Sequence, residues 1–305
     1  MRCAQHWSSE LIVLTLCTLL SAVCWGGEAT GRASLSTELR RAFGDQKGAA
    51  VVIRVRDSQI LAAHNIPVLT RRVATPGSSM KPFTLQFLID NKLLKGTDRI
   101  ACRRSLTISG IRLNCSHPAP HGAFDAQEAL AFSCNSYFAE AAKRLPRLRF
   151  EQYLRGLGFD RTTGLLPGEA EGHVPAARTI QERQLLAIGA AGIEITPLEL
   201  AAAYMRLARR QKAPTESERV VLNGLAAATD YGLAQGARPG SLKIAGKTGT
   251  AADPGGAVTH AWFAGFAPAD SPQVVVVVFV ERGRGSVEAA NVARRILKAW
   301  EGTAQ

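Results

Sequence analysis

The sequence lacks several of the patterns by which classes of protein are recognised. It has no internal repeat and no low-complexity linker, so neither a solenoid nor a string of tethered modules is expected. Although its formal net charge is +12, it contains no long Lys/Arg block and no nucleic-acid-binding motif, which argues against nucleic acid as a partner. No C-x-x-C spacing occurs, and neither a metal site nor a cofactor is expected.

Beyond its N-terminus the chain also lacks an apolar run long enough to cross a bilayer. The N-terminal run, Leu11 to Val23, follows the positive Arg2, precedes small residues and is shorter than the about 20 residues of a spanning helix. This layout is typical of a secretory signal. We expect residues 1–29 to be a signal peptide or an uncleaved membrane anchor. The protein is then exported, to the periplasm or the outer face of the cytoplasmic membrane.

Few cysteines lie outside the targeting segment: Cys102, Cys115 and Cys134. In an exported protein Cys102 and Cys115 could form a disulfide, or they could remain free buried thiols. The stretch between them contains Ser109-Gly110 and could fold back as a hairpin. Cys134 is expected to be a small buried side chain rather than a reactive thiol.

What the sequence does contain is a globular pattern, with 46% hydrophobic residues. Strand patterns gather at both ends of the chain, at residues 51–56, 59–63, 242–251, 259–266 and 273–280. Two amphipathic helices flank them. Their apolar stripes are Leu35, Leu39 and Phe43 in the first, and Ala289, Val292, Ala293, Ile296 and Trp300 in the second.

The residues between these ends have a mainly helical pattern, with a clear helix start in the capping box Thr196-Pro197-Leu198-Glu199. The simplest assembly is an α+β fold. It has a five-stranded antiparallel sheet, N- and C-terminal helices on one face, and an inserted all-helical subdomain. We expect one domain over residues 30–305, with its sheet part in 35–75 and 237–305 and its helical part in 78–236.

Three short motifs stand in a fixed order along this fold, and together they are the parts of one acyl-transfer site. They are S-x-x-K at Ser78 to Lys81, S-x-N at Ser133 to Asn135, and K-T-G at Lys247 to Gly249. Each motif alone is weak. Their order, spacing and local setting are hard to obtain by accident.

The S-x-x-K motif follows a turn and precedes an apolar helix, so Ser78 lies in the first helical turn with Lys81 one turn later. A serine hydroxyl is a weak nucleophile until a base takes its proton, and Lys81 can do this if burial keeps it partly neutral. Ser79 is the rival nucleophile. It is two residues from Lys81 and therefore points to a different face of the helix, so we prefer Ser78.

The other two motifs supply the remaining groups. Ser133 could pass a proton between Lys81 and the leaving group, and Asn135 could hold Lys81 and donate to a substrate carbonyl. Lys247 places a cation near a substrate carboxylate, Thr248 adds a substrate-binding hydroxyl, and Gly249 lets an extended peptide pair with the strand. The N–H groups of Thr250 and Ser78 would form an oxyanion hole. Local alternatives stay open: a capped helix start, a polar helix break, and a glycine bulge in an edge strand.

From about Ala49 onward the chain resembles the transpeptidase domain of penicillin-binding proteins, within the superfamily of serine DD-peptidases and β-lactamases. The segments that carry the resemblance are Pro76–Phe83, His121-Gly122, Ala129–Phe138, Leu166–Ala170, Ile195–Leu198, Ala245–Ala251 and Ala261–Pro268. We expect the chain to be close to a bare catalytic domain, and other cell-wall synthesis proteins are candidate partners for its targeting to the cell wall.

The resemblance implies that Ser78 attacks a D-Ala-D-Ala stem peptide, and that β-lactams acylate the same serine. The alternatives are a β-lactamase or DD-carboxypeptidase on the same scaffold, or a non-catalytic β-lactam sensor. Glu169 and Glu171 lack the E-x-x-L-N context of class A β-lactamases. We therefore expect slow deacylation, and a loop-ordering role for Glu169.

Overall fold

The computed structural model describes the chain except for residues 1–33, 119–121, 253–255, 257 and 304–305. The expected signal peptide or anchor and His121 lie outside the described residues. In the part of the chain that is described, no helix is both long and apolar enough to pass through a bilayer.

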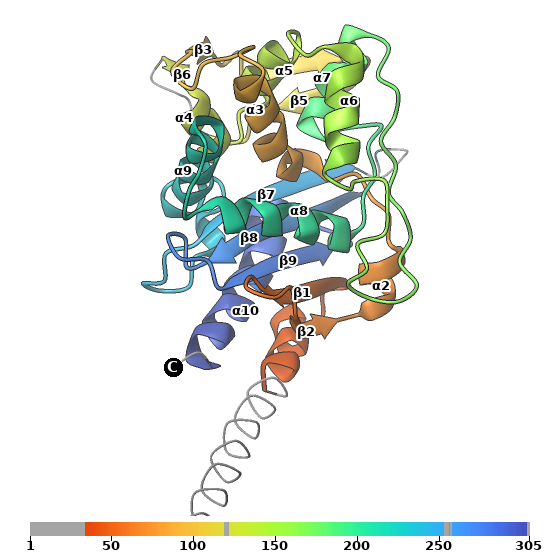
Figure 1. Ribbon diagram of the computed structural model, residues 1–305, viewed down its shortest axis with the longest axis vertical. Coiled ribbons are helices and arrows are strands. Elements are labelled where there is room, and N and C mark those ends of the chain that lie inside the picture. Colours follow the sequence, from red (N-terminus) through yellow and green to blue (C-terminus); the bar gives the residue numbers. More distant parts are fainter. Residues whose placement is uncertain (1–33, 119–121, 253–255, 257, 304–305) are drawn as a thin grey trace, which may run out of the picture.

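A five-stranded antiparallel sheet forms the base of the molecule, in the order β2-β1-β9-β8-β7 (Figure 1). The strands come from both ends of the chain, which confirms the expected sheet. Their bounds are β1 Gly48–Arg54, β2 Ile60–His64, β7 Ala245–Ala252, β8 Thr259–Ala267 and β9 Val274–Val280. Central β9 is a run of valines and one phenylalanine that is buried throughout, as a strand covered on both faces requires.

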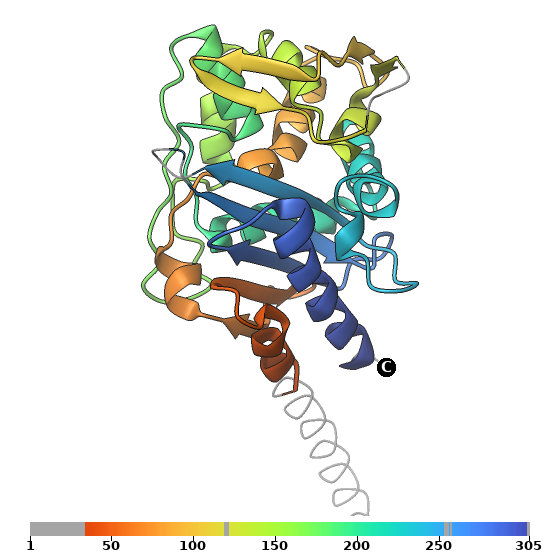
Figure 2. The ribbon, with the colours of Figure 1, turned by 180° about the vertical axis from the view of Figure 1, so that it is seen from behind.

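Each face of the sheet packs against helices of its own. The helix at residues 34–43 and α10, Ala290–Thr303, cover one face (Figure 2), where Leu39 and Ile296 share a core with Val276. Helix α8, Pro197–Arg210, covers the other face, and the core there includes Val277. The two terminal helices thus lie on one face, as expected. Helix α8 begins with the expected capping box at Thr196 and Glu199.

The inserted part stands above the edge strand β7 and is mostly helical (Figure 1). Its helices are α3 Lys81–Asp90, α4 Ala126–Ala131, α5 Asn135–Ala142, α6 Arg147–Gly156, α7 Ile180–Ile188 and α9 Glu216–Asp230. Short turns of helix complete the described helices: α2 Ile66–Arg71, η1 Gly77–Met80, η2 Gln235–Ala237 and η3 Gly285–Ala289.

The expectation that this part is all-helical was wrong in one respect, because it also contains two small sheets. One pairs β3, Ile100–Ala101, with β6, Ala123–Phe124, and the other pairs β4, Ser105–Ile108, with β5, Ile111–Asn114. Strands this short carry too few alternating residues to stand out in the sequence. The hairpin expected around Ser109-Gly110 is confirmed. Both residues have positive φ, 48° and 80°, as a type I′ turn requires.

Candidate active site

The segment η1, which carries the predicted nucleophile, turns the chain so that Ser78 and Ser79 face opposite ways. Ser78 lines a cavity, whereas the hydroxyl of the fully buried Ser79 donates to the Pro76 carbonyl at 2.8 Å. Gly77 makes this turn at a φ of +57°, and a side chain there would come within 2.6 Å of the Thr250 carbonyl oxygen. The start of η1 is therefore packed directly on β7, with Ser78 as its accessible hydroxyl.

Side chains from the sheet and from α8 hold this segment from behind. Trp262 Nε1 and His260 Nε2 on β8 both hydrogen-bond the Thr75 carbonyl, at 3.0 and 2.7 Å. Tyr204 on α8 donates its hydroxyl to the Ser79 carbonyl at 3.1 Å. The motifs did not reveal these positioning residues. Trp262 and His260 lie in an otherwise mostly apolar strand and Tyr204 lies in a helix, so no short motif joins the three in the sequence.

Lys81 opens α3 directly after the 3-10 turn, in which residues i and i+3 lie above one another. Its Nζ donates to the Ser133 carbonyl at 2.8 Å, to the Ser133 hydroxyl at 3.2 Å and to Asn135 Oδ1 at 2.6 Å. An ammonium has three protons, so these acceptors satisfy all of them. Complete burial lowers the pKa of Lys81 to about 8, which leaves a neutral fraction near physiological pH.

The S-x-N arm, Ser133 to Asn135, is the junction of α4 and α5. Helix α4 ends in a Schellman pattern, in which Cys134 N–H donates to Ala129 O at 2.9 Å and Ser133 N–H to Leu130 O at 3.2 Å. Ser133 stands at the position that glycine usually takes there, with φ +54°. Such a left-handed conformation costs a non-glycine residue about 1–2 kcal/mol. It turns both oxygens of Ser133 onto Lys81.

The K-T-G motif lies on β7, at the edge of the sheet. A side chain on Gly249 would come within 2.5 Å of the Pro76 carbonyl and 3.1 Å of Ser79 N. Position 249 therefore requires glycine because η1 packs closely on the strand.

Lys247 of the same motif has no exposed surface, and its Nζ donates to the Thr248 carbonyl at 3.2 Å. Burial, and then the charge of Lys81, holds its pKa well below the usual range.

A cavity of about 290 Å³ brings most of these groups together. The sequence-predicted residues in its wall are Ser78, Ser133, Asn135, Thr248 and Thr250. Lys81, Lys247 and Gly249 do not line it, and both lysines are fully buried. The motifs missed the rest of the wall, which comprises Arg112, Leu113, Asn114, Ser116, Leu233, Arg284 and Ser286. Arg112 and Arg284 bring guanidinium groups that suit a carboxylate; the only hint of Arg284 was its place between two glycines.

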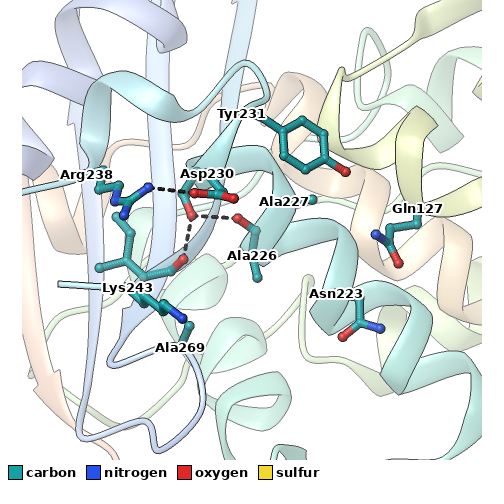
Figure 3. Close-up of a pocket in the computed structure, with 11 residues that line it drawn as sticks. Gln127, Asn223, Ala226, Ala227, Asp230, Tyr231, Arg238, Lys243 and Ala269 are labelled. Atoms are coloured by element: carbon teal, nitrogen blue, oxygen red, sulfur yellow. Dashed lines mark hydrogen bonds and ion pairs between the residues drawn. The ribbon is translucent and has the colours of Figure 1, made fainter. Parts of the chain in front are cut away.

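A second cavity, of about 340 Å³, lies at α9 and the start of β7 and is shown in Figure 3. Its wall includes the ion pair Arg238–Asp230, at 2.6 Å, together with Tyr231, Gln127 and Asn223. It holds none of the residues predicted from the three motifs, and it shows no nucleophile next to a base. The smaller cavity at Ser78 therefore has the arrangement for chemistry.

The cysteines left open by the sequence lie beside the S-x-N arm as free thiols. Cys102 and Cys115 are not bridged, and their sulfur atoms are 3.5 Å apart. Cys134 is fully buried, as expected, and its Sγ is 3.9 Å from that of Cys115. His117 joins this group. The expectation of no metal site was based on the absence of short spacings between metal ligands. It overlooked that His117 and His121 stand four residues apart, which is an H-x-x-x-H spacing.

A serine hydroxyl one helical turn from a buried lysine of lowered pKa, with a second serine and an amide bound to that lysine, is the set of groups that a serine acyltransferase uses. The chain belongs to the family described as penicillin binding protein transpeptidase domain, whose model matches residues 48–298. That assignment confirms the resemblance seen in the motifs.

The relatives found by sequence are peptidoglycan enzymes and a sporulation protein. The chain is 27% identical to the peptidoglycan D,D-transpeptidase MrdA of Acinetobacter baumannii, over 59% of this chain and 35% of that protein. It is 26% identical to stage V sporulation protein D of Bacillus subtilis, over 73% of this chain and 40% of that protein. The chain thus spans less than half the length of these two relatives.

Solved structures show the same fold. The transpeptidase domain of Burkholderia pseudomallei penicillin-binding protein 3 superposes with a TM-score of 0.78 at 22% identity, covering 89% of this chain and 93% of that one. Pseudomonas aeruginosa PBP2 superposes with a TM-score of 0.76 at 23% identity, covering 88% of this chain and 74% of that one. Both confirm the α+β architecture expected from the sequence.

Proposed function

We propose that this protein is a serine D,D-transpeptidase that acts on D-Ala-D-Ala stem peptides in peptidoglycan cross-linking and is acylated by β-lactams. The observation that carries the proposal is the set of hydrogen bonds from Lys81 Nζ to Ser133 and Asn135, one helical turn after Ser78. Membership in the penicillin-binding transpeptidase family and the names of the relatives support it.

In the proposed acylation, neutral Lys81 takes the hydroxyl proton of Ser78 as its Oγ attacks the carbonyl carbon between the two D-Ala residues. The N–H groups of Ser78 and Thr250 stabilise the oxyanion, and the contact of Gly77 with Thr250 supports this pairing. The C–N bond then breaks, Ser133 passes the proton to the departing D-Ala amine, and the ester on Ser78 is attacked by an acceptor amine or by water. With a β-lactam, the ring amide opens and the leaving group stays attached.

The position of β7 suggests how the peptide is held. It is the outermost strand of the sheet, so an extended stem peptide can pair with its outer edge beside Thr248 and Thr250. Because Lys247 is fully buried, we assign contact with the terminal carboxylate to the Thr248 hydroxyl and the Arg284 guanidinium at the cavity wall. Lys247 then acts from behind the strand.

A β-lactamase or DD-carboxypeptidase remains the second candidate on the same scaffold, with a non-catalytic sensor third. The position of Glu169 argues against fast hydrolysis. Its carboxylate accepts hydrogen bonds from Thr163 N–H, the Thr163 hydroxyl and Leu166 N–H, which supports a loop-ordering role, and it does not line the Ser78 cavity. No carboxylate lines that cavity in the described part of the chain.

The test is covalent labelling with a fluorescent penicillin. We expect one label on the parent protein, none on Ser78→Ala, and an unchanged label on the matched variant Ser79→Ala if it folds. Label that survives in Ser78→Ala and maps to Ser79 would overturn the nucleophile assignment. Intact-mass spectrometry then follows the adduct. Persistence over hours supports the transpeptidase, whereas clearance within seconds favours the β-lactamase.

The site also implies where the protein works. We infer export to the periplasm or to the outer face of the cytoplasmic membrane, because the proposed substrate is found there and the N-terminal sequence resembles a secretory signal. Within the chain, we infer a transpeptidase domain over residues 30–305. Other cell-wall synthesis proteins are its expected partners.

A further inference from the structure

Three cysteines and a histidine from separate segments meet next to the S-x-N arm. Cys102 directly follows β3, Cys115 directly follows β5, His117 comes two residues later, and Cys134 is the N-cap of α5. Their sulfur and ring-nitrogen atoms all lie within 4.8 Å of one another. Because the residues come from different elements, a search for short spacings in the sequence could not assemble them.

Three distances among these atoms are close to those of a tetrahedron around one metal ion. With Zn–S near 2.3 Å and Zn–N near 2.0–2.1 Å, tetrahedral ligands are separated by about 3.8 Å for S···S and about 3.6 Å for S···N. The structure has 3.5 Å between Cys102 and Cys115, 3.9 Å between Cys115 and Cys134, and 3.5 Å between Cys102 Sγ and His117 Nε2. A disulfide would require about 2.05 Å and would leave the third cysteine and the histidine unexplained.

The hydrogen bonds around the four side chains prepare them as ligands. His117 Nδ1 lies 2.6 Å from the Pro118 carbonyl, so it carries the proton there and leaves the lone pair of Nε2 directed at Cys102. Two of the sulfur atoms also receive a backbone N–H. The donors are Arg104 to Cys102 at 3.3 Å and Tyr137 to Cys134 at 3.4 Å. Such bonds stabilise thiolates, the form that binds metal.

The surroundings favour a closed site. His117 is 1% exposed, and its ring packs against Phe124 with centroids 5.1 Å apart. Cys115 and Cys134 are buried as well, while Arg104 donates to the His117 carbonyl at 2.6 Å and places a positive charge beside the group. Four protein ligands with no open position are typical of structural zinc, and thiolate with imidazole suits zinc over magnesium or calcium.

We propose that Cys102, Cys115, His117 and Cys134 form a tetrahedral Cys3His site for Zn²⁺. Binding replaces the thiol protons, which pass to solvent, and no electron is transferred. The ion would join β3, the β5 end of the hairpin and the N-terminus of α5 into one rigid unit.

The position of the site gives it a role in the reaction centre. Cys134 stands between Ser133 and Asn135, and Asn135 Nδ2 also donates to the carbonyl of Asn114, the neighbour of Cys115, at 3.0 Å. The zinc would therefore hold both residues that bind Lys81. It acts as a brace for the S-x-N arm and does not touch the substrate.

Metal analysis of the full-length protein, purified without chelator and desalted, tests the site. We expect one zinc per chain. After exchange, Co²⁺ should give a thiolate-to-cobalt charge-transfer band in the near ultraviolet and the intense visible bands of tetrahedral cobalt. Metal-free protein in which Cys102, Cys115 and Cys134 all alkylate would overturn the proposal. So would a peptide map that shows a disulfide between any two of them.

A matched pair of variants adds a second measurement. His117→Asn should lose the stoichiometric zinc, while His173→Asn, at an exposed histidine, should retain it. If His117→Asn fails to fold, the cobalt spectrum of the parent protein still decides the question. Retention of one zinc by a folded His117→Asn would remove the histidine from the site.

Chelator treatment tests the bracing role. Stripped protein should react with penicillin about tenfold or more slowly, with recovery on addition of Zn²⁺, because a small displacement of a catalytic group is costly. An unchanged rate would overturn the link to the arm. Metal content and cobalt spectra do not depend on activity. If the protein binds one zinc but is not labelled by penicillin, the metal site is supported and the proposed function is contradicted.

Discussion

Two segments bring polar groups to the Ser78 cavity, and the structure holds them in different ways. Strand β7 pairs with β8 over an unbroken register from Ala245 to Ala252, so the sheet itself places Thr248 and Thr250. The S-x-N arm has no strand partner. Its shape depends on a helix end, a left-handed Ser133 and the four side chains around Cys134.

The difference shows how one site can combine a rigid platform with an adjustable group. The strand contributes backbone and hydroxyls whose positions follow from hydrogen bonds of the whole sheet. The arm contributes Ser133 and Asn135, which accept hydrogen bonds from the Lys81 amine and so orient its protons. Disturbance of the strand should therefore affect folding and reaction together, whereas disturbance of the arm should affect mainly the reaction.

The largest effect is expected from removal of the group that the arm holds. Lys81→Met keeps the length of the side chain but removes the base, so acylation by penicillin should slow by about 100- to 10,000-fold. The matched variant Lys247→Met removes a lysine that is equally buried and donates to the Thr248 carbonyl of its own strand, and it should slow acylation less. Stopped-flow or quenched labelling gives both rates. A greater loss in Lys247→Met would reverse the roles of the two lysines.

A methyl group on the strand should damage both folding and reaction. In Gly249→Ala the new carbon would lie 2.5 Å from the Pro76 carbonyl, so the nucleophile segment must move. We expect a loss of about 1–3 kcal/mol in the free energy of unfolding. Acylation should slow by about a hundredfold because Ser78 is displaced.

The control for that variant is Gly156→Ala, near the end of α6, where a side chain meets nothing within 4 Å. Alanine is a better helix former than glycine, so this change should leave acylation unaltered and not reduce stability. Chemical denaturation and the labelling rate measure both variants. Equal behaviour of the two would show that η1 does not depend on close packing against β7.

The pH dependence reports the state of Lys81 itself. Burial lowers its pKa to about 8 against the opposing charges of Cys134, Cys115 and Cys102, and buried Lys247 lies near enough for the two lysines to interact. Below this pKa the lysine is an ammonium and cannot accept the Ser78 proton. The acylation rate should thus rise about tenfold per pH unit up to about pH 8 and level off above it. A rate that falls as pH rises from 6 to 8 would exclude Lys81 as the base.

The smallest expected effect is a difference in stability between two variants of Ser133, which separates its backbone strain from the role of its hydroxyl. Ser133→Gly and Ser133→Ala both remove the hydroxyl, but only glycine is at ease at φ +54°. Ser133→Gly should therefore be more stable than Ser133→Ala by about 1 kcal/mol, with both slowed in acylation. Urea unfolding of the two variants measures the difference. Equal stabilities would mean that Ser133 carries no strain.

Much of the site was predictable because its chemistry sits in short motifs with local geometry. Ser78, Lys81, Ser133, Asn135, Thr248 and Thr250 could be identified because a helix start, a helix break and a strand are each set by nearby residues. The five-stranded antiparallel sheet was also predictable from the strand patterns at both chain ends, but its strand order came from the structure. The two small sheets were not predictable, because strands of two to four residues leave no periodic signal.

The sequence by itself predicted the candidate catalytic side chains and determined the five strands and the helices that frame them, since these depend on residues close together in the chain. Only the tertiary structure decided that Lys247 is covered, that Arg284 reaches the cavity and that Cys102, Cys115, His117 and Cys134 meet. Burial and convergence are properties of segments distant along the chain, and packing alone brings them within a few ångströms.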